Sequence, residues 1–230
     1  SLIIPTILIL YTVVFIILRI LPGNPVLAVL GTKNIPPEQL QEIMAELGLN
    51  KPLYVQYFEY LWNVLHGDFG TSMIIRGRRI ATDILERLPA TIELSVAGLL
   101  VSLVIGLITG VGAAIKKDTP ADTGLRMFGA ITYTIFIPWL GLLFQMVFAI
   151  WLSILPVSGR IDPGVNIQTI TGFYILDSII TGNWDAFKSA FSHLILPALT
   201  LGLVLSGPYT RLVRNNMVKQ LESNYIFAYL

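Results

Sequence analysis

The stretch that decides the fold is Leu94–Ile115, LSVAGLLVSLVIGLITGVGAAI, which contains no Lys, Arg, Asp or Glu. Two further windows share this property, Met127–Gly159 and Ser189–Thr210, and a fourth apolar stretch opens the chain at Ser1–Leu18. About 20 mainly apolar residues cross the hydrocarbon layer of a bilayer as a helix, so each stretch qualifies as a membrane span. The sequence therefore predicts an all-α, polytopic membrane protein with four spans.

Composition supports this class. Of the 230 residues, 54% are hydrophobic and 13% are charged, whereas soluble domains carry about 25% charged residues. The formal net charge of +1 is not that of a nucleic-acid-binding protein, which would be strongly basic. The absence of cysteine excludes disulfides, thiolate metal sites and thiol nucleophiles.

Basic residues predict the orientation, because positive charge beside spans marks the cytoplasmic side. The short connection Lys116–Arg126 holds three basic residues, and Arg211, Arg214 and Lys219 follow the last span. Both segments and the N-terminus are therefore expected in the cytoplasm. The predicted segments are transmembrane helix 1 at 1–21, an extracellular or periplasmic helical cap at 22–89, transmembrane helix 2 at 90–115, a cytoplasmic loop at 116–126, transmembrane helix 3 at 127–154, an extracellular or periplasmic loop at 155–188, transmembrane helix 4 at 189–213 and a cytoplasmic segment at 214–230.

The segment Pro22–Pro89 holds 13 of the 29 charged residues and resembles a small soluble cap. Helices are expected to begin at Pro36 and at Pro52, since proline suits a first helical turn. A third, short helix around Ile84 is expected to end at Pro89, before the second span. An aromatic stripe in the cap is interpreted as core packing and interfacial belt rather than a ligand platform: Tyr54, Tyr57, Phe58, Tyr60 and Trp62.

Polar and kink-forming residues inside the spans favour transport. A proline in a span frees backbone carbonyls that must be satisfied by protein or a cavity. The candidate pathway or kink residues are Pro138, Gln145, Pro197, Ser206 and Pro208. Gly106 and Gly110 form a GxxxG pair, which lets helix backbones approach closely. Packing explains these glycines as well as a pathway does.

An enzyme is not indicated. The sequence contains no HExxH, GxSxG or GxxxxGK[ST] motif, so it predicts no catalytic, cofactor-binding or metal-binding residue. His66 is interpreted as a loop residue beside Gly67, and His193 as a helix N-terminus before Leu194. Glu93 lies at a span edge, where its side chain can reach water.

Several short motifs together resemble a known family, the permease subunits of binding-protein-dependent ABC importers of the dipeptide and oligopeptide type, in particular the first of their two permease paralogues. The resemblance covers essentially the whole chain. Its carriers are Leu21-Pro22-Gly23-Asn24-Pro25, Glu46–Pro52 followed by Gln56-Tyr57, Gly67-Asp68-Phe69-Gly70 with Ser72, Arg87-Leu88-Pro89 with Thr91-Ile92-Glu93-Leu94, Pro156-Val157-Ser158-Gly159-Arg160, and Leu196-Pro197-Ala198.

The resemblance implies a multi-pass protein of the prokaryotic plasma (inner) membrane. It implies a second permease subunit, two ATP-binding subunits that carry ATP and Mg, and an extracellular substrate-binding protein. Six spans are expected for the family, so the chain is expected to be truncated at the C-terminus and to lack its N-terminal tip. The residues that would contact an ATPase through a coupling helix in 214–230 are Met217, Leu221, Asn224, Tyr225 and Ala228.

The chain departs from the family pattern at two places. Phe136 and Pro138 are exchanged, which predicts a kink about half a turn later in span three, and Tyr229-Leu230 replaces the usual Ala-Arg. Short peptides are the expected substrate, with nickel complexes or oligosaccharides as alternatives. A fragment of a secondary transporter would place charged residues deep in the spans, and a membrane-anchored receptor module would have one or two spans.

Overall fold

The computed structural model describes residues 2–20, 44–45, 48, 50–72 and 78–222. Regular structure in this described part is helical, with one isolated β-bridge between Thr71 and Arg79. The chain divides into two compact units, residues 1–86 and residues 87–230. The predicted all-α class is confirmed for the described residues.

The first unit contains α1 (Ile3–Ile20) and α4 (Leu53–Leu65), and Pro52 precedes α4 as expected. The Tyr11 hydroxyl of α1 donates to the main-chain oxygen of Tyr57 at 2.8 Å, and the two rings lie 5.0 Å apart. Phe15 packs edge-on against Tyr57 at 5.2 Å. Tyr57 is thus a packing residue, as the core interpretation of the aromatic stripe predicted. The expected helix start at Pro36 lies outside the described residues.

Helix α5 (Ile80–Ile115) passes through Pro89 without interruption. The prediction that Pro89 ends a short helix before the span is therefore wrong. Proline removes one helix hydrogen bond and clashes with the preceding turn, but good helix formers on both sides keep the helix continuous. The Pro89 ring instead packs closely against Gly172. A Cβ atom added to that glycine would lie 3.0 Å from the Cγ of Pro89.

The third apolar window forms α6 (Pro120–Thr134), α7 (Ile137–Phe144) and the π-helix η1 (Gln145–Trp151). The two halves are bent by 100° at residues 135–136. The chain bends just before Pro138, which occupies the first turn of α7 where its missing N–H is not needed. That this kink lies half a turn later than in the family pattern stays a prediction. The predicted loop 116–126 is also shorter than expected, since Thr119 caps α6 and Pro120 begins it.

The last two helices are α8 (Tyr174–Ile180) and α9 (Trp184–Leu221), which continues through Pro197 and Pro208. Asn183 caps α9, because its side chain accepts a hydrogen bond from the Ala186 amide at 3.0 Å. His193 therefore lies inside the helix and is buried, so its interpretation as a helix N-terminus is wrong. The cap at Asn183 starts the helix about one and a half turns earlier than the charge-free window, which begins at Ser189.

Within the described residues, two helices, α5 and α9, are long and apolar enough to cross a membrane, and a third span results if the bent pair of α6 and α7–η1 counts as one. α1 is apolar but shorter over its described side chains, Ile3–Ile17. These counts support a helical membrane protein, while the four-span total and the outer cap stay predictions.

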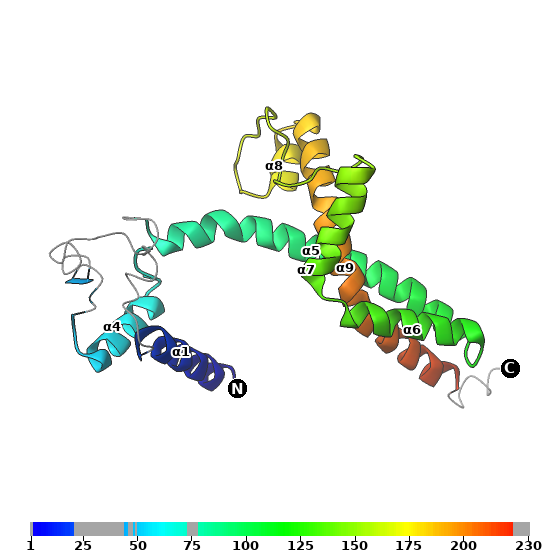
Figure 1. Ribbon diagram of the computed structural model, residues 1–230, viewed down its shortest axis with the longest axis horizontal. Coiled ribbons are helices and arrows are strands. Elements are labelled where there is room, and N and C mark those ends of the chain that lie inside the picture. The colour runs from blue at the N-terminus through cyan, green and yellow to red at the C-terminus, as the bar shows by residue number, and fades with distance from the viewer. Residues whose placement is uncertain (1, 21–43, 46–47, 49, 73–77, 223–230) are drawn as a thin grey trace. The chain divides into compact units, whose positions relative to one another are not determined.

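Small residues bring α5, α6 and α9 into close contact (Figure 1). A Cβ on Gly106 would lie 2.5 Å from the Cβ of Tyr209, and one on Gly110 would lie 2.7 Å from that of Val213. The Thr109 and Thr210 hydroxyls are 2.6 Å apart across the same interface. The GxxxG pair is therefore a helix-packing surface, which fixes α9 beside α5 and positions the site described next.

Candidate functional site

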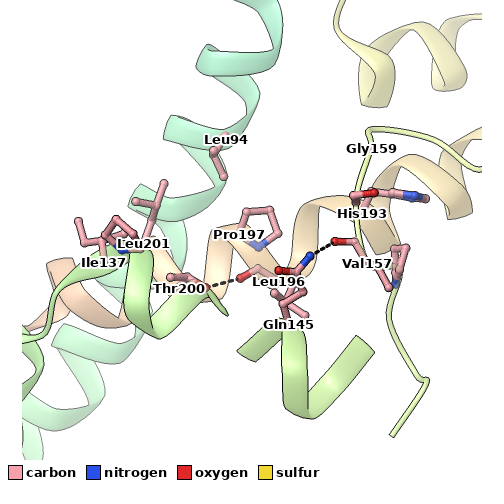
Figure 2. Close-up of a pocket in the computed structure, with 14 residues that line it drawn as sticks. Leu94, Ile137, Gln145, Val157, Gly159, His193, Leu196, Pro197, Thr200 and Leu201 are labelled. Atoms are coloured by element: carbon pink, nitrogen blue, oxygen red, sulfur yellow. Dashed lines mark hydrogen bonds between the residues drawn. The ribbon is translucent and has the colours of Figure 1, made fainter. Parts of the chain in front are cut away.

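A cavity of about 380 Å³ lies between α7, η1, α9 and the loop that follows η1 (Figure 2). Its wall includes Pro138, Gln145 and Pro197, three of the five candidate pathway residues. Leu94 of α5 and Thr200 of α9 also line it. The structure thus brings together residues that the sequence analysis selected from two separate spans.

Gln145 has a defined contact. Its Nε2 donates to the main-chain oxygen of Val157 at 2.7 Å, which ties η1 to the loop (Figure 2). Gln145 is also the first residue of the π-helix, a rare element that is frequent at functional sites. The amide therefore shapes the cavity wall by holding the loop in place.

Pro197 leaves one main-chain carbonyl near the cavity without its usual hydrogen bond from the helix. Because proline has no N–H, it donates no helix hydrogen bond to the carbonyl of His193, one turn earlier. Thr200, on the next turn, directs its own hydroxyl to the Leu196 oxygen at 2.8 Å. The wall formed by α9 is thus mostly apolar with a few placed polar groups.

A second cavity of about 180 Å³ shares Leu94, Gly159, His193 and Pro197 with the first. Its wall contains an ion pair in which Nη2 of Arg160 lies 2.7 Å from Oε2 of Glu93. The other carboxylate oxygen of Glu93 accepts the Ile175 amide of α8 at 2.8 Å. Glu93 therefore fastens the segment 155–188, named the outer segment after the side predicted for it, to α5. The interpretation of Glu93 as a span-edge residue that reaches water missed this role.

Arg160 makes two further contacts on the side of the outer segment. The guanidinium lies 3.7 Å from the ring centroid of Tyr174 and donates to the Gly172 oxygen at 3.1 Å. Cation–π contact and charge-assisted hydrogen bonding both favour arginine over lysine here. No sequence spacing indicated these partners, because they come from three separate segments.

His193 lies where the two cavities meet. Its Nδ1 is 2.8 Å from the Ser189 oxygen, and its Nε2 is 3.8 Å from Oδ1 of Asp162. The Ser189 hydroxyl donates to Oδ2 of Asp162 at 2.6 Å. Asp162 thereby ties the outer segment to α9 as Glu93 ties it to α5.

Asp177 organises the outer segment from inside α8. Its buried carboxylate accepts the amides of Ile170, Thr171 and Gly172 at 3.1, 2.9 and 3.0 Å. Burial alone would raise the pKa of Asp177, but these hydrogen bonds and the one from the Thr171 hydroxyl hold its pKa below the ordinary value. The ionised carboxylate therefore fixes the turn that presents the Gly172 oxygen to Arg160.

The remaining candidate residues lie elsewhere. Ser206 is buried in α9 with its hydroxyl on the Leu203 oxygen at 2.6 Å, and Pro208 is exposed, so neither lines the cavity. Met217 and Leu221 are four residues apart near the end of α9 and share a helix face. Asn224, Tyr225 and Ala228 lie outside the described residues.

The arrangement suits passage or binding of a solute, since the cavity wall is mostly apolar and carries a few polar groups such as Gln145 and Thr200. Long apolar helices around such a cavity are typical of membrane transport proteins. Three sequence motifs, 87–94, 156–160 and 196–198, converge on this one place.

Comparison with known proteins places the chain in a family. The family model described as "Binding-protein-dependent transport system inner membrane component" matches residues 102–230, and the model of its N-terminal region matches residues 2–95. The chain belongs to this family. It is a permease subunit of an ABC importer and a membrane protein, as the resemblance predicted.

Individual relatives agree. The chain is 36% identical over 226 residues to the di/tripeptide transport system permease protein of Pseudomonas aeruginosa, covering 98% of this chain and 67% of that protein. It is 35% identical over 232 residues to the dipeptide transport system permease protein of Escherichia coli K12, with the same coverage. The relative from Alkalihalophilus pseudofirmus, also a dipeptide permease, is 34% identical over 225 residues, covering 98% of this chain and 67% of the relative. The chain thus spans about two thirds of the length of these relatives.

Proposed function

We propose that this permease subunit forms part of the path for short peptides delivered by an extracellular binding protein. The observation that carries the substrate class is the 36% identity over 226 residues to a di/tripeptide permease. The cavity of about 380 Å³ supports it, since small-molecule sites occupy about 300–1,000 Å³ and combine apolar walls with few polar groups. Nickel complexes and oligosaccharides are the alternative substrates.

The proposed assembly contains a second permease subunit, two ATP-binding subunits and the binding protein. ATP and Mg would bind to the ATP-binding subunits, so this chain would perform no hydrolysis itself. Met217 and Leu221 would begin the surface that contacts an ATPase, an apolar helix face of the kind that docks in a groove. Asn224, Tyr225 and Ala228 would continue it.

The proposed orientation places the N-terminus in the cytoplasm. Two ion pairs support it, because Lys117 binds Glu222 and Arg214 binds Asp122. The basic turn after α5 and the basic end of α9 therefore lie at the same end of their unit, as the positive-inside rule requires of two cytoplasmic segments. The segment 155–188 would then face outward.

The test is reconstitution of the complete importer in proteoliposomes, with labelled dipeptide and the loaded binding protein outside. We expect uptake that requires both ATP and the binding protein. Uptake of oligosaccharide or a nickel complex instead of dipeptide would contradict the substrate class. Robust uptake without the ATPases would contradict the whole proposal and favour a secondary transporter.

The cavity is tested by filling it. Thr200→Trp places a large ring on the cavity wall, so dipeptide uptake should fall while the complex still assembles. Leu205→Trp is the matched control, since Leu205 is 43% exposed on the same helix and does not line the cavity. Equal uptake by the two variants would show that the cavity is not part of the path.

A further inference from the structure

The end of α9 is bound to the first turn of α6 by an ion pair whose carboxylate is buried. Arg214 contacts Asp122 with two nitrogens, Nε at 2.7 Å from Oδ1 and Nη2 at 2.5 Å from Oδ2. Asp122 is 1% exposed and the Arg214 side chain is 13% exposed. Two parallel hydrogen bonds fix the relative orientation of the two groups as well as their distance.

Asp122 is itself fixed to the turn between α5 and α6. Its Oδ2 also accepts the Asp118 amide at 3.2 Å, and its own amide donates to the hydroxyl of the capping residue Thr119 at 3.4 Å. Lys117, in the same turn, binds Glu222 at the end of α9. Since eight residues rise about 12 Å along an α-helix, the two ion pairs attach the last two turns of α9 to the turn at two separate points.

The attachment continues along α6 to the cavity. Gly207 of α9 lies against the main chain of Gly129, so α6 packs directly on α9. The chain bends after Thr134 and reaches the cavity wall at Ile137 and Pro138. Packed groups therefore connect the end of α9 to the cavity through α6 without a gap. The chain changes direction once along this connection, at residues 135–136.

We propose that Asp122 is a positioning residue for energy coupling. Its ion pair with Arg214 makes α6 move with the end of α9. A displacement that an ATPase imposes on the end of α9 therefore reaches the cavity wall at Pro138. This inference rests on the proposed function. It concerns the described residues 117–222 and requires no contact beyond them.

The test uses the assembled importer in proteoliposomes and measures dipeptide uptake and ATP hydrolysis together. Asp122→Asn keeps the shape of the side chain but removes the charge. We expect the peptide transported per ATP to fall about tenfold, in the range of typical coupling free energies, while basal hydrolysis changes less than about twofold. Arg214→Lys keeps the charge without the two-nitrogen contact and should give an intermediate ratio.

Asp118→Asn is the matched control, because it removes a carboxylate from the same turn. The Asp118 side chain is 81% exposed, so this variant should transport as much peptide per ATP as the wild type. The inference is overturned if Asp122→Asn also transports the wild-type amount of peptide per ATP, or if its uptake and hydrolysis fall in parallel as expected for a structural defect alone. If Asp122→Asn does not assemble, Arg214→Lys serves instead, and a wild-type amount of peptide transported per ATP in that variant overturns the inference. Absence of ATP-dependent peptide uptake in the wild type would contradict the proposed function instead.

Discussion

Arg160 and Glu93 stand 67 positions apart in the chain, yet Nη2 of the first lies 2.7 Å from Oε2 of the second. Glu93 also accepts the Ile175 amide, so one carboxylate connects α5 to two parts of the outer segment. This contact joins two of the short motifs that resemble the permease family, residues 87–94 and residues 156–160.

Glu93→Gln should loosen the outer segment. The amide keeps a hydrogen-bond acceptor for Ile175 but loses the charge that holds Arg160. Breaking a fully buried pair costs about 3–5 kcal/mol. Because Arg160 is 32% exposed, we expect about 1–2 kcal/mol here, the remainder being screened by water. Hydrogen–deuterium exchange of residues 170–176 should accelerate accordingly.

The control for this change is Glu59→Gln, which breaks the exposed ion pair of Lys51 and Glu59, where both side chains are nearly half exposed. Such surface pairs contribute about 0–1 kcal/mol, so exchange near Glu59 should hardly change. Unaltered exchange of residues 170–176 in Glu93→Gln would show that the ion pair does not hold the outer segment.

Gly106→Ala should destabilise the contact of α5 with α9. Its new Cβ would lie 2.5 Å from the Cβ of Tyr209, a distance that requires the helices to separate. Overpacking of this kind costs about 1–3 kcal/mol, so the melting temperature in detergent should fall. Gly124→Ala is the control, because no atom lies within 4 Å of its new Cβ. That variant should be unchanged or slightly more stable, since alanine favours a helix by about 1 kcal/mol over glycine.

Asp177 predicts a pH dependence. Hydrogen bonds from Thr171 and neighbouring amides overcome the effect of burial and hold the pKa of Asp177 below its ordinary value, so the folded state favours the ionised carboxylate. This stabilisation is complete above the unfolded pKa of about 4 and disappears as the pH falls through the lower pKa of the folded state. Asp177→Asn cannot ionise and lacks this contribution at every pH.

The measurement is the melting temperature of wild type and Asp177→Asn between neutral and acidic pH. We expect the wild type to be more stable near neutrality and the difference to shrink below about pH 4. Asp185→Asn is an exposed control from the first turn of α9. A difference between wild type and Asp177→Asn that stays constant down to pH 3 would contradict the role given to the carboxylate.

Several elements followed from the sequence pattern alone. The charge-free windows Leu94–Ile115 and Ser189–Thr210 lie inside α5 and α9, because only a helix satisfies its backbone across an apolar layer. The third window, Met127–Gly159, contains a 100° bend that the charge pattern did not reveal, since apolar residues suit a helix running in either direction. Thr134 and Pro138 flank the break, but neither residue type fixes the angle of a bend.

The site was predicted only in part. Pro138, Gln145 and Pro197 line the cavity as a pathway interpretation requires, whereas Ser206 and Pro208 do not. A proline in a span signals a freed carbonyl but not the direction in which it faces, and that direction depends on how the helix is rotated against its neighbours.

By itself, the sequence determined the helical membrane class, the two long spans and the family, because these depend on local composition and on short motifs in a fixed order. Tertiary structure alone decided which charges meet: Glu93 with Arg160, and Asp122 with Arg214. A charged side chain at a span edge has water as its default partner. Only the packing of distant segments brings the opposite charge within hydrogen-bond distance and makes that residue a connection between helices.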